Sequence, residues 1–466
     1  MKNFILIALS ILTITSCMQK KQAHHTPSTF TGAAGEVRLI TLDPGHFHAA
    51  LIQKTSYNQI SKDVYVYSPG GEDLKEHLAR IDAYNARPDA PTDWNEIVYV
   101  GGDFLEKMLT EQKGNVMVTS GNNQLKTDYI EKTLETGIHV LADKPMVINS
   151  DKFEELKACF EIAQQKGILL YDIMTERYEI TNILQRELSL LPDIYGRQET
   201  GTAEDPAIEM KSVHHFYKLV SGKALTRPAW YYDTEQQGEA LVDVSTHLVD
   251  LVQWECFPEI ALDYRKDIKM LSARHWPTVM SKEQFKASTG LDKFPEYLRK
   301  DIKNDSLYEY QNGEINYQLK GIHAKLTILW NFEAPAGTGD VHYSRMSGSK
   351  ADLVILQDKA QHYKPELYIY SGKEADAPNY EKALERNFQA LQSKYPGIEL
   401  EKTDDPKGWH VLIPESYRVG HEAHFGQVTQ NFLRYLVDGK LPDWEVPNMI
   451  AKYFVTTQAL KMAKGE

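Results

Sequence analysis

The chain lacks three features that would each point to a particular class of protein. Only three cysteines occur among 466 residues, too few for a fold built on disulfides. Lysine and arginine number 52 against 65 aspartates and glutamates, giving a net charge of −13 and no basic tract for nucleic acid. Beyond the N-terminus, no apolar run is long enough to span a bilayer. Hydrophobic residues still make up 42%, so the sequence is that of a globular protein with substantial cores, not of a disordered one.

The N-terminus has the pattern of a targeting segment. Lys2 precedes an apolar stretch over residues 4–14, which ends in small residues at Thr15-Ser16-Cys17. The tetrapeptide 14–17 resembles a bacterial lipobox, in which the cysteine carries the lipid. We therefore expect a lipoprotein signal peptide over 1–17, a polar linker over 18–35, and a lipid anchor in the periplasm or outer membrane. A plain signal peptide or a short anchor are the alternatives.

From residue 36 to about 174 the chain alternates between short apolar strands and amphipathic helices. Strands are expected at 37–42, 64–67, 97–100, 116–118, 138–141 and 168–171, with helices at 74–84, 104–109, 125–134 and 153–163 between them. Buried strands alternating with helices favour a parallel sheet covered on both faces. The sequence therefore predicts a Rossmann-like, doubly wound α/β domain that binds ligands at the carboxyl ends of its strands.

A different pattern begins at about residue 175. Longer strand-like stretches with partial alternation occur at 211–217, 324–332, 353–357 and 367–370, and helices are expected at 240–256, 425–437 and 449–462. We expect an α+β C-terminal domain over 175–466, with a large, mostly antiparallel sheet whose exposed face favours self-association. The polar segments 275–320 and 372–412 are interpreted as turn-rich insertions.

The turn after the first strand departs from a dinucleotide-binding loop. Where G-x-G-x-x-G is expected, the sequence Asp43-Pro44-Gly45-His46-Phe47-His48 keeps only the middle glycine, and Ser68 ends the second strand in place of an acidic residue. His46 and His48 form an H-x-H pair, but no cysteine or carboxylate ligand pattern lies near them in the sequence. We therefore predict no metal site.

Two other segments are stronger candidates for chemistry. Lys144 follows the fifth strand, where ligands lie in such sheets. The alternative is a surface lysine in a turn. Asp243 and His247 are four residues apart in a largely apolar helix, so the carboxylate could orient the imidazole for acid–base work. The alternative is a capping aspartate beside a satisfied core histidine.

Taken together, these motifs resemble those of the glucose-fructose oxidoreductase / inositol dehydrogenase / MocA (Gfo/Idh/MocA) family. The family's E-K-P motif is matched by Asp143-Lys144-Pro145. Its G-G-x-L-x-D-x-x-x-H motif is matched at Gly238, Leu241, Asp243 and His247. Its strand-four turn is similar to Gly121-Asn122-Asn123. The likeness extends over residues 36 to about 260, weakens through the sheet domain and returns near 421–439. The longer C-terminal region with its insertions departs from the family pattern and suggests a lipoprotein subgroup of the family.

The resemblance implies hydride transfer between NAD or NADP and a secondary alcohol of a sugar, polyol or glycoside. Because an exported enzyme cannot easily draw on cytosolic cofactor, we expect the cofactor to be tightly bound. Lys144 would polarise the reacting oxygen, His247 would be the general acid/base, and Asp243 would orient the site. Contacts to the cofactor would come from Gly45, His46, Phe47, Ser68, Gly121, Asn123 and Lys144. Contacts to the carbohydrate would come from Arg177, Tyr178, His214, Trp230 and Tyr231, for which core packing is an equal alternative.

Two other functions remain open at this stage. A redox-neutral, NAD-dependent glycosidase of the same family would oxidise, eliminate and re-reduce its substrate. A catalytically inactive, lipid-tethered carbohydrate-binding protein would have kept the fold and lost the cofactor. Neither reading involves nucleic acid, and in both the membrane is reached only through the lipid on Cys17.

Overall fold

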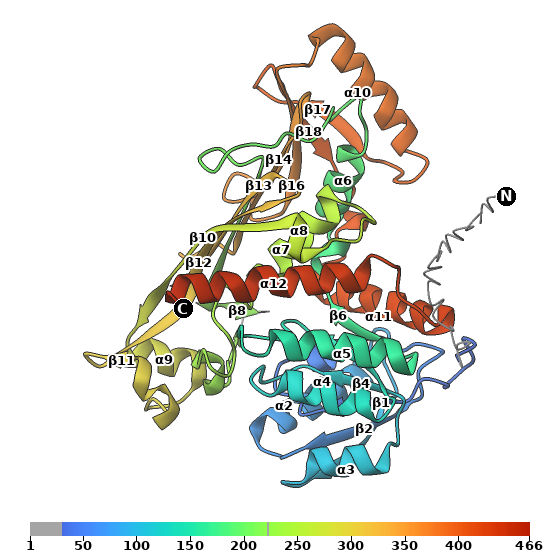
Figure 1. Ribbon diagram of the computed structural model, residues 1–466, viewed down its shortest axis with the longest axis vertical. Helices are drawn as coiled ribbons and strands as arrows, with labels where there is room; N and C mark the ends of the chain where they lie inside the picture. The colour runs from blue at the N-terminus through green and yellow to red at the C-terminus, as the bar shows by residue number, and fades with distance from the viewer. Residues whose placement is uncertain (1–29, 221–222) are drawn as a thin grey trace, which may run out of the picture.

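The computed structural model describes residues 30–220 and 223–466. The predicted signal peptide, lipidated Cys17 and most of the linker lie outside these residues. Figure 1 shows the N-terminal part of the chain below and a large sheet domain above, with the long helix α12 (Glu445–Lys464) running between them. None of the helices in the described part of the chain is both long and apolar enough to cross a membrane.

The N-terminal sheet has six parallel strands in the order β3-β2-β1-β4-β5-β6, the strand order of a Rossmann fold. Each strand lies within a few residues of its predicted position, so the predicted Rossmann-like domain is confirmed. The strands are β1 (Leu39–Leu42), β2 (Asp63–Ser68), β3 (Asn95–Val100), β4 (Val116–Thr119), β5 (His139–Asp143) and β6 (Leu170–Ile173). The helices are α1 (His48–Leu51), α2 (Glu72–Ala86), α3 (Phe104–Glu111), α4 (Lys126–Glu135) and α5 (Phe153–Lys166).

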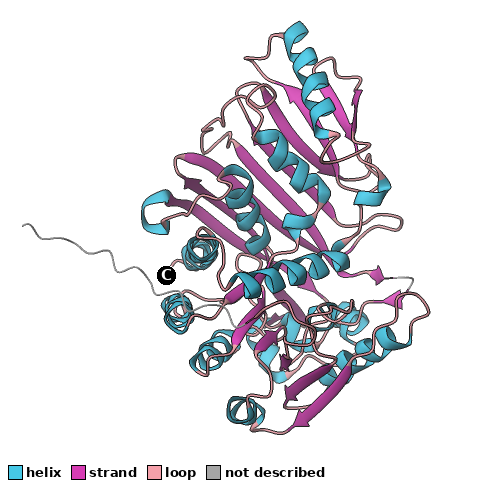
Figure 2. Ribbon diagram, turned by 90° about the vertical axis from the view of Figure 1, so that its right-hand side faces the viewer, coloured by secondary structure: helices cyan, strands magenta, loops and turns pink. Residues whose placement is uncertain are grey.

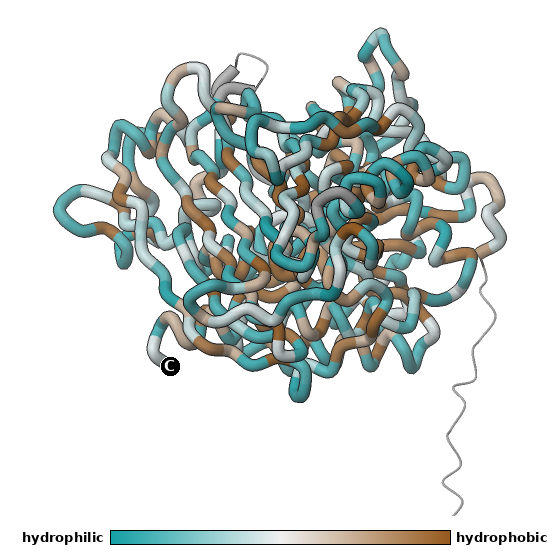
Figure 3. Tube along the Cα trace, turned by 90° about the horizontal axis from the view of Figure 1, so that it is seen from above, coloured by the Kyte–Doolittle hydropathy of each residue, from teal (hydrophilic) through white to brown (hydrophobic). Residues whose placement is uncertain are grey.

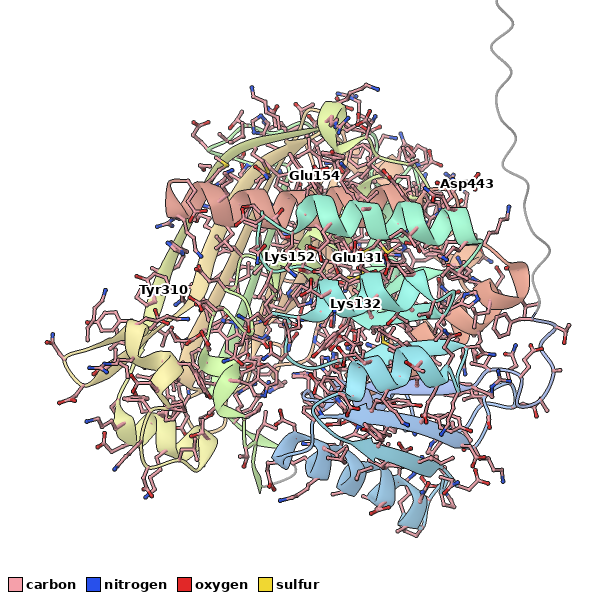
Figure 4. All side chains as sticks on the ribbon, turned by 60° about the horizontal axis from the view of Figure 1, so that its bottom comes forward. Glu131, Lys132, Lys152, Glu154, Tyr310 and Asp443 are labelled. Atoms are coloured by element: carbon pink, nitrogen blue, oxygen red, sulfur yellow. The ribbon has the colours of Figure 1, made fainter. Side chains whose placement is uncertain are left out.

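Helices α4 and α5 lie side by side on the sheet, and the apolar side of each helix faces the sheet. Ile130 and Leu134 of α4 and Phe153 and Leu156 of α5 are buried. The opposite faces of these helices are charged, and Figure 4 labels Glu131, Lys132 and Glu154 on this outer surface. One-sided apolar periodicity explains why the sequence located these helices closely.

The C-terminal sheet is mixed but mostly antiparallel, as predicted. Its order is β10-β12-β13-β7-β14-β15-β16-β18-β17, with β11 paired to β12, and β7 and β13 form its one parallel pair within the described residues. The strands are β7 (Ile208–Tyr217), β10 (Ile268–Met280), β11 (Ile302–Lys303), β12 (Ser306–Leu319), β13 (Ile322–Glu333), β14 (Val341–Ser347), β15 (Ala351–Gln357), β16 (Glu366–Ser371), β17 (Glu399–Lys402) and β18 (Gly408–Leu412). A separate small ribbon is formed by β8 (Leu219–Val220) and β9 (Lys223–Ala224).

The interpretation of 275–320 and 372–412 as insertions was wrong. The first segment contains the last six residues of β10 and all of β12, and these two strands pair along almost their whole length. The second segment contains α10 (Ala377–Leu391), β17 and β18. In β12, buried residues alternate with partly exposed ones except at 311–313, and about half of the strand is polar, including buried Glu309, Gln311 and Asn312. That polarity made a long two-sided strand look like a loop. Between β10 and β12 lie α9 (Lys282–Thr289) and the short helix η3 (Glu296–Asp301).

Helices cover one face of the large sheet, as Figure 2 shows. Helices α6 (Ile180–Ser189), α7 (Ser245–Cys256) and α12 pack against β15, β13 and β10, respectively. The remaining elements are α8 (Tyr264–Asp267), α11 (His421–Asp438) and the short helices η1 (Glu176–Tyr178), η2 (Ala229–Tyr232) and η4 (Glu415–Tyr417). Figure 3 shows apolar residues mostly in the interior of the molecule and polar residues mostly at the outer loops.

Helices α11 and α12 return to the N-terminal domain. Phe425 and Phe432 of α11, together with Met449 and Tyr453 of α12, belong to the same buried cluster as the Rossmann strands. Other residues of α12 (Ala451, Val455, Ala459 and Leu460) belong to the core of the large sheet. The last helix therefore contributes to both hydrophobic cores.

Candidate active site

A cavity of about 670 Å³ lies at the carboxyl ends of β1, β4 and β5 and is closed by residues of the large-sheet domain. It is lined from both halves of the chain. Among the lining residues are His46, Phe47, His48, Gly121, Asn123, Asp143, Lys144, Glu176, His214, Tyr231, Asp243, His247, Trp330 and His421. Its position is the one at which open parallel sheets bind ligands.

Lys144 and Asp243 form an ion pair inside this cavity. Lys144 follows directly after β5, and its bond to Pro145 is cis. Its Nζ donates to Oδ1 of Asp243 at 2.6 Å, and the two side chains are only 11% and 5% exposed. The ammonium is thereby held at the carboxyl end of the parallel sheet by a residue of the other domain.

Asp243 positions the lysine rather than the histidine. It precedes α7, which begins at Ser245, and its second oxygen accepts from Gln237 Nε2 at 3.1 Å. No hydrogen bond joins Asp243 to His247 in the described residues. The sequence placed both residues on one helical turn, but the chain before Ser245 is a series of turns, so the carboxylate points toward Lys144 instead.

His247 lies in the first turn of α7 and lines the cavity. Its Nδ1 is buried without a hydrogen-bond partner. Burial, with Lys144 and His421 nearby, holds the pKa of the His247 imidazole well below its usual value. The ring is therefore neutral near pH 7, the form that accepts a proton from an alcohol.

At the turn that lacks two of the three expected glycines, the backbone after β1 lies very close to the backbone after β4. A methyl group on Gly121 would lie 2.6 Å from the carbonyl oxygen of Asp43 and 2.8 Å from the amide nitrogen of Gly45. The amides of Gly45 and His46 both donate to the Ser120 carbonyl oxygen, at 3.1 and 3.2 Å, whereas that of Phe47 has no partner in the described residues. These tight contacts bring the turn after β1 close to the turn after β4. Phe47, Gly121, Asn123 and Lys144 line the cavity there and are the residues that would face a dinucleotide.

The family of the chain is decided by comparison with known proteins. Residues 45–172 match the model "Oxidoreductase family, NAD-binding Rossmann fold" of Gfo/Idh/MocA proteins, and residues 184–464 match "Putative oxidoreductase C terminal domain". The chain belongs to the Gfo/Idh/MocA oxidoreductase family. It is thus an oxidoreductase with an NAD-binding domain, as its motifs indicated.

Solved structures agree with this assignment. A "putative oxidoreductase" from Parabacteroides merdae is 60% identical, with a TM-score of 0.92 over 94% of this chain and 99% of that one. Levoglucosan dehydrogenase in complex with NADH and levoglucosan is 12% identical, with a TM-score of 0.58 over 92% and 97%. A 3-ketoreductase from Actinomadura kijaniata in complex with NADP is also 12% identical, with a TM-score of 0.53 over 92% and 97%. The two distant structures share the fold, and no curated protein matches the chain.

Among the residues predicted to hold the cofactor, Ser68 and Gly45 do not line the cavity of this Gfo/Idh/MocA protein. Ser68 is buried, and its Oγ accepts from the Gly70 amide at 3.0 Å. A carboxylate does follow β2, but five residues later: Asp73 accepts from Trp230 Nε1 at 2.8 Å. Trp230 covers Gly45 rather than lining the cavity.

The residues predicted to contact substrate divide into two groups. His214 and Tyr231 line the cavity, and His214 stacks on Trp330 with ring centroids 4.9 Å apart. Arg177 and Tyr178 do not line it. Arg177 is buried between Asp250 and Glu445 and donates to Asp250 at 2.6 and 2.7 Å and to Glu445 at 2.8 and 3.1 Å.

Several cavity residues gave no usable signal in the sequence. Glu176 adjoins a predicted residue, and burial raises the pKa of its carboxyl to about 7. Trp330 and His421 come from β13 and α11, about 80 and 170 residues after His247. Only the topology of the large sheet and the return of α11 bring them to the site.

Proposed function

We propose that this protein is an NAD(P)-dependent dehydrogenase that transfers hydride between nicotinamide and a secondary alcohol of a sugar, polyol or glycoside. The single observation that supports this most is the presence of Lys144 and His247 in one cavity, at the end of β5. An ammonium and a neutral imidazole are the pair of groups that alcohol oxidation requires.

In this proposal each residue has a distinct task. Bound NAD(P) would supply the acceptor for the hydride of the carbinol carbon. His247 takes the hydroxyl proton, and Lys144 stabilises the negative charge that develops on the oxygen. Asp243 holds the lysine in place through the 2.6 Å ion pair.

A carbohydrate substrate is favoured by the aromatic residues around the cavity. Trp330, His214 and Tyr231 line it, and aromatic side chains suit contact with sugars. Asp340, which accepts from His215 Nδ1 and Lys218 Nζ at 2.9 Å each, supplies acceptors for hydroxyl groups at the rim.

We further propose that the protein is exported and tethered by lipid on Cys17, in line with the N-terminal sequence. An enzyme outside the cytoplasm has little free dinucleotide available, so the cofactor is expected to remain bound through the catalytic cycle. Intact-mass measurement of the membrane-extracted protein tests the anchor: an N-terminal diacylated Cys17 is expected, and an unmodified chain starting elsewhere contradicts it.

The decisive experiment has two parts. The purified protein is denatured, and the released nucleotides are identified by mass spectrometry; NAD or NADP near one equivalent is expected. Sugars, polyols and glycosides are then supplied, and products are analysed together with NADH absorbance. A ketone product supports the dehydrogenase. Release of an aglycone without ketone or NADH favours the redox-neutral glycosidase, and neither nucleotide nor turnover contradicts both enzymes.

A further inference from the structure

Three side chains with metal-ligating atoms meet where the turn after β1 faces the end of β5. Nδ1 of His46 lies 3.9 Å and Nδ1 of His48 lies 3.0 Å from Oδ2 of Asp143. All three ligand atoms lie within 4.8 Å of one another. The carboxylate that the sequence did not place beside the H-x-H pair is thus supplied by a residue 95 positions later.

We propose that His46, His48 and Asp143 bind a divalent transition-metal ion, with Zn²⁺ preferred. Two imidazoles and one carboxylate are a common ligand set for catalytic zinc. Ligands on a tetrahedral zinc at their usual bond lengths lie about 3.3 Å apart. The two observed separations of 3.0 and 3.9 Å bracket that value, so small side-chain rotations are enough to admit the ion.

The carboxylate of Asp143 is available to a metal despite two lysines nearby. Lys126 Nζ donates at 2.9 Å to the backbone carbonyl of Asp143, not to its side chain, and Lys144 is paired with Asp243. Oδ2 accepts from Ser120 Oγ at 2.7 Å and from His48, while Oδ1 accepts no hydrogen bond in the described residues. Ser120 would then orient the bound carboxylate from behind, as outer hydrogen bonds commonly do in metal sites.

Three protein ligands leave a coordination position open. His46, His48 and Asp143 line the same cavity as Lys144 and His247, so that position faces a ligand oxygen bound there. The metal site goes beyond the proposed hydride transfer, and metal binding is measured without dinucleotide or sugar. A protein that binds no metal would therefore leave the dehydrogenase proposal intact.

A second histidine cluster in the cavity provides a matched comparison. His214 and His215 lie 3.7 and 2.9 Å from Asp340, but Lys218 Nζ donates to the same carboxylate at 2.9 Å. An ammonium in direct contact with the carboxylate opposes a divalent cation. We therefore expect metal binding at the first cluster and not at the second.

Cobalt titration of the chelator-treated full chain tests the site, because Co²⁺ in a protein ligand field absorbs visible light. The wild type is expected to bind one equivalent of Co²⁺, displaced by Zn²⁺, and His214→Ala is expected to bind it equally. His46→Ala and His48→Ala are expected to lose the spectrum. Thermal unfolding checks the fold; should His48→Ala not fold, His46→Ala, whose side chain is 19% exposed, decides the matter. No cobalt spectrum in the wild type, retention in folded His46→Ala, or loss in His214→Ala overturns the proposal.

Discussion

The Nζ atom of Lys144 lies 2.6 Å from Oδ1 of Asp243 and joins the end of a Rossmann strand to the segment before α7. The two residues are 99 positions apart and belong to different domains. Both side chains are almost completely buried. A lysine held in this way is pre-oriented before any ligand enters the cavity, which lowers the cost of ordering it during the reaction.

Removing either partner of this pair is expected to slow hydride transfer. Lys144→Met removes the group that stabilises the developing alkoxide and should lower kcat by about 100- to 1000-fold. Asp243→Asn leaves the lysine without its partner and should lower kcat less. Because both act through the same ammonium, the double variant should be no slower than Lys144→Met. The rate at which the bound cofactor is reduced in a single turnover, followed by NADH absorbance on a sugar that the wild type oxidises, measures this. Lys152→Met, at the start of α5, is the control, and independent additive effects would contradict the pairing.

The pH dependence of oxidation should reflect the lowered pKa of His247. A depressed pKa means that the imidazole stays neutral, and able to accept a proton, at pH values below its usual 6.5. The kcat/KM of the wild type should therefore not fall with a midpoint near pH 6.5. Any fall near that pH should remain in a His247 variant, because it does not come from this residue. His247→Gln should lower kcat/KM by about 100-fold or more at every pH. A His247 variant with nearly normal rates would remove this residue from the mechanism.

Glu176 should make the stability of the protein fall between about pH 4.5 and 7. Burial raises the pKa of its carboxyl from 4.5 to about 7. A group with a raised pKa contributes its full stability below the unfolded value and loses it as the pH rises through the folded value, here near 7. Glu176→Gln cannot ionise, so at pH 8 it should be more stable, relative to the wild type, than at low pH by up to about 3 kcal/mol. At pH 4 the two should unfold alike. Thermal unfolding at both pH values measures the difference, with exposed Glu154→Gln as the control; equal stability at pH 8 would contradict the buried carboxyl.

Arg177 should matter for stability rather than for substrate binding. It lies between the buried carboxylates of Asp250 and Glu445, and Lys452 Nζ also donates to Asp250 at 2.9 Å. Arg177→Met leaves buried negative charge without its main partner and should cost about 3–5 kcal/mol in urea unfolding. Arg274→Met, which breaks an exposed pair with Glu314, should cost about 1 kcal/mol or less. A large change in substrate KM with unchanged stability would restore the substrate role expected from the sequence.

Local pattern was sufficient for the Rossmann sheet because its strands, apart from the edge strand β3, are mostly buried and its helices are apolar on one face. The strand-end position of Lys144 followed from the same pattern. The polar alternation of β12 concealed a 14-residue strand, because only pairing with β10 and β13 distinguishes it from a loop. The partner of Asp243, Lys144, could not be predicted, because it lies 99 positions away in the sequence. The same holds for Asp143 and its partner His48, which are 95 positions apart. Arg177 was placed correctly near the end of β6, but its ion pairs depend on α12, which no local signal connects to it.

The contribution of α12 to both cores bears on how the polypeptide acquires its structure during synthesis. The last helix emerges from the ribosome long after the six parallel strands, yet Met449 and Tyr453 complete the layer that shields those strands from water. Neither hydrophobic core can therefore be completed while translation is still under way. Folding must await the finished polypeptide, and a truncation before Glu445 would leave both domains with incomplete cores.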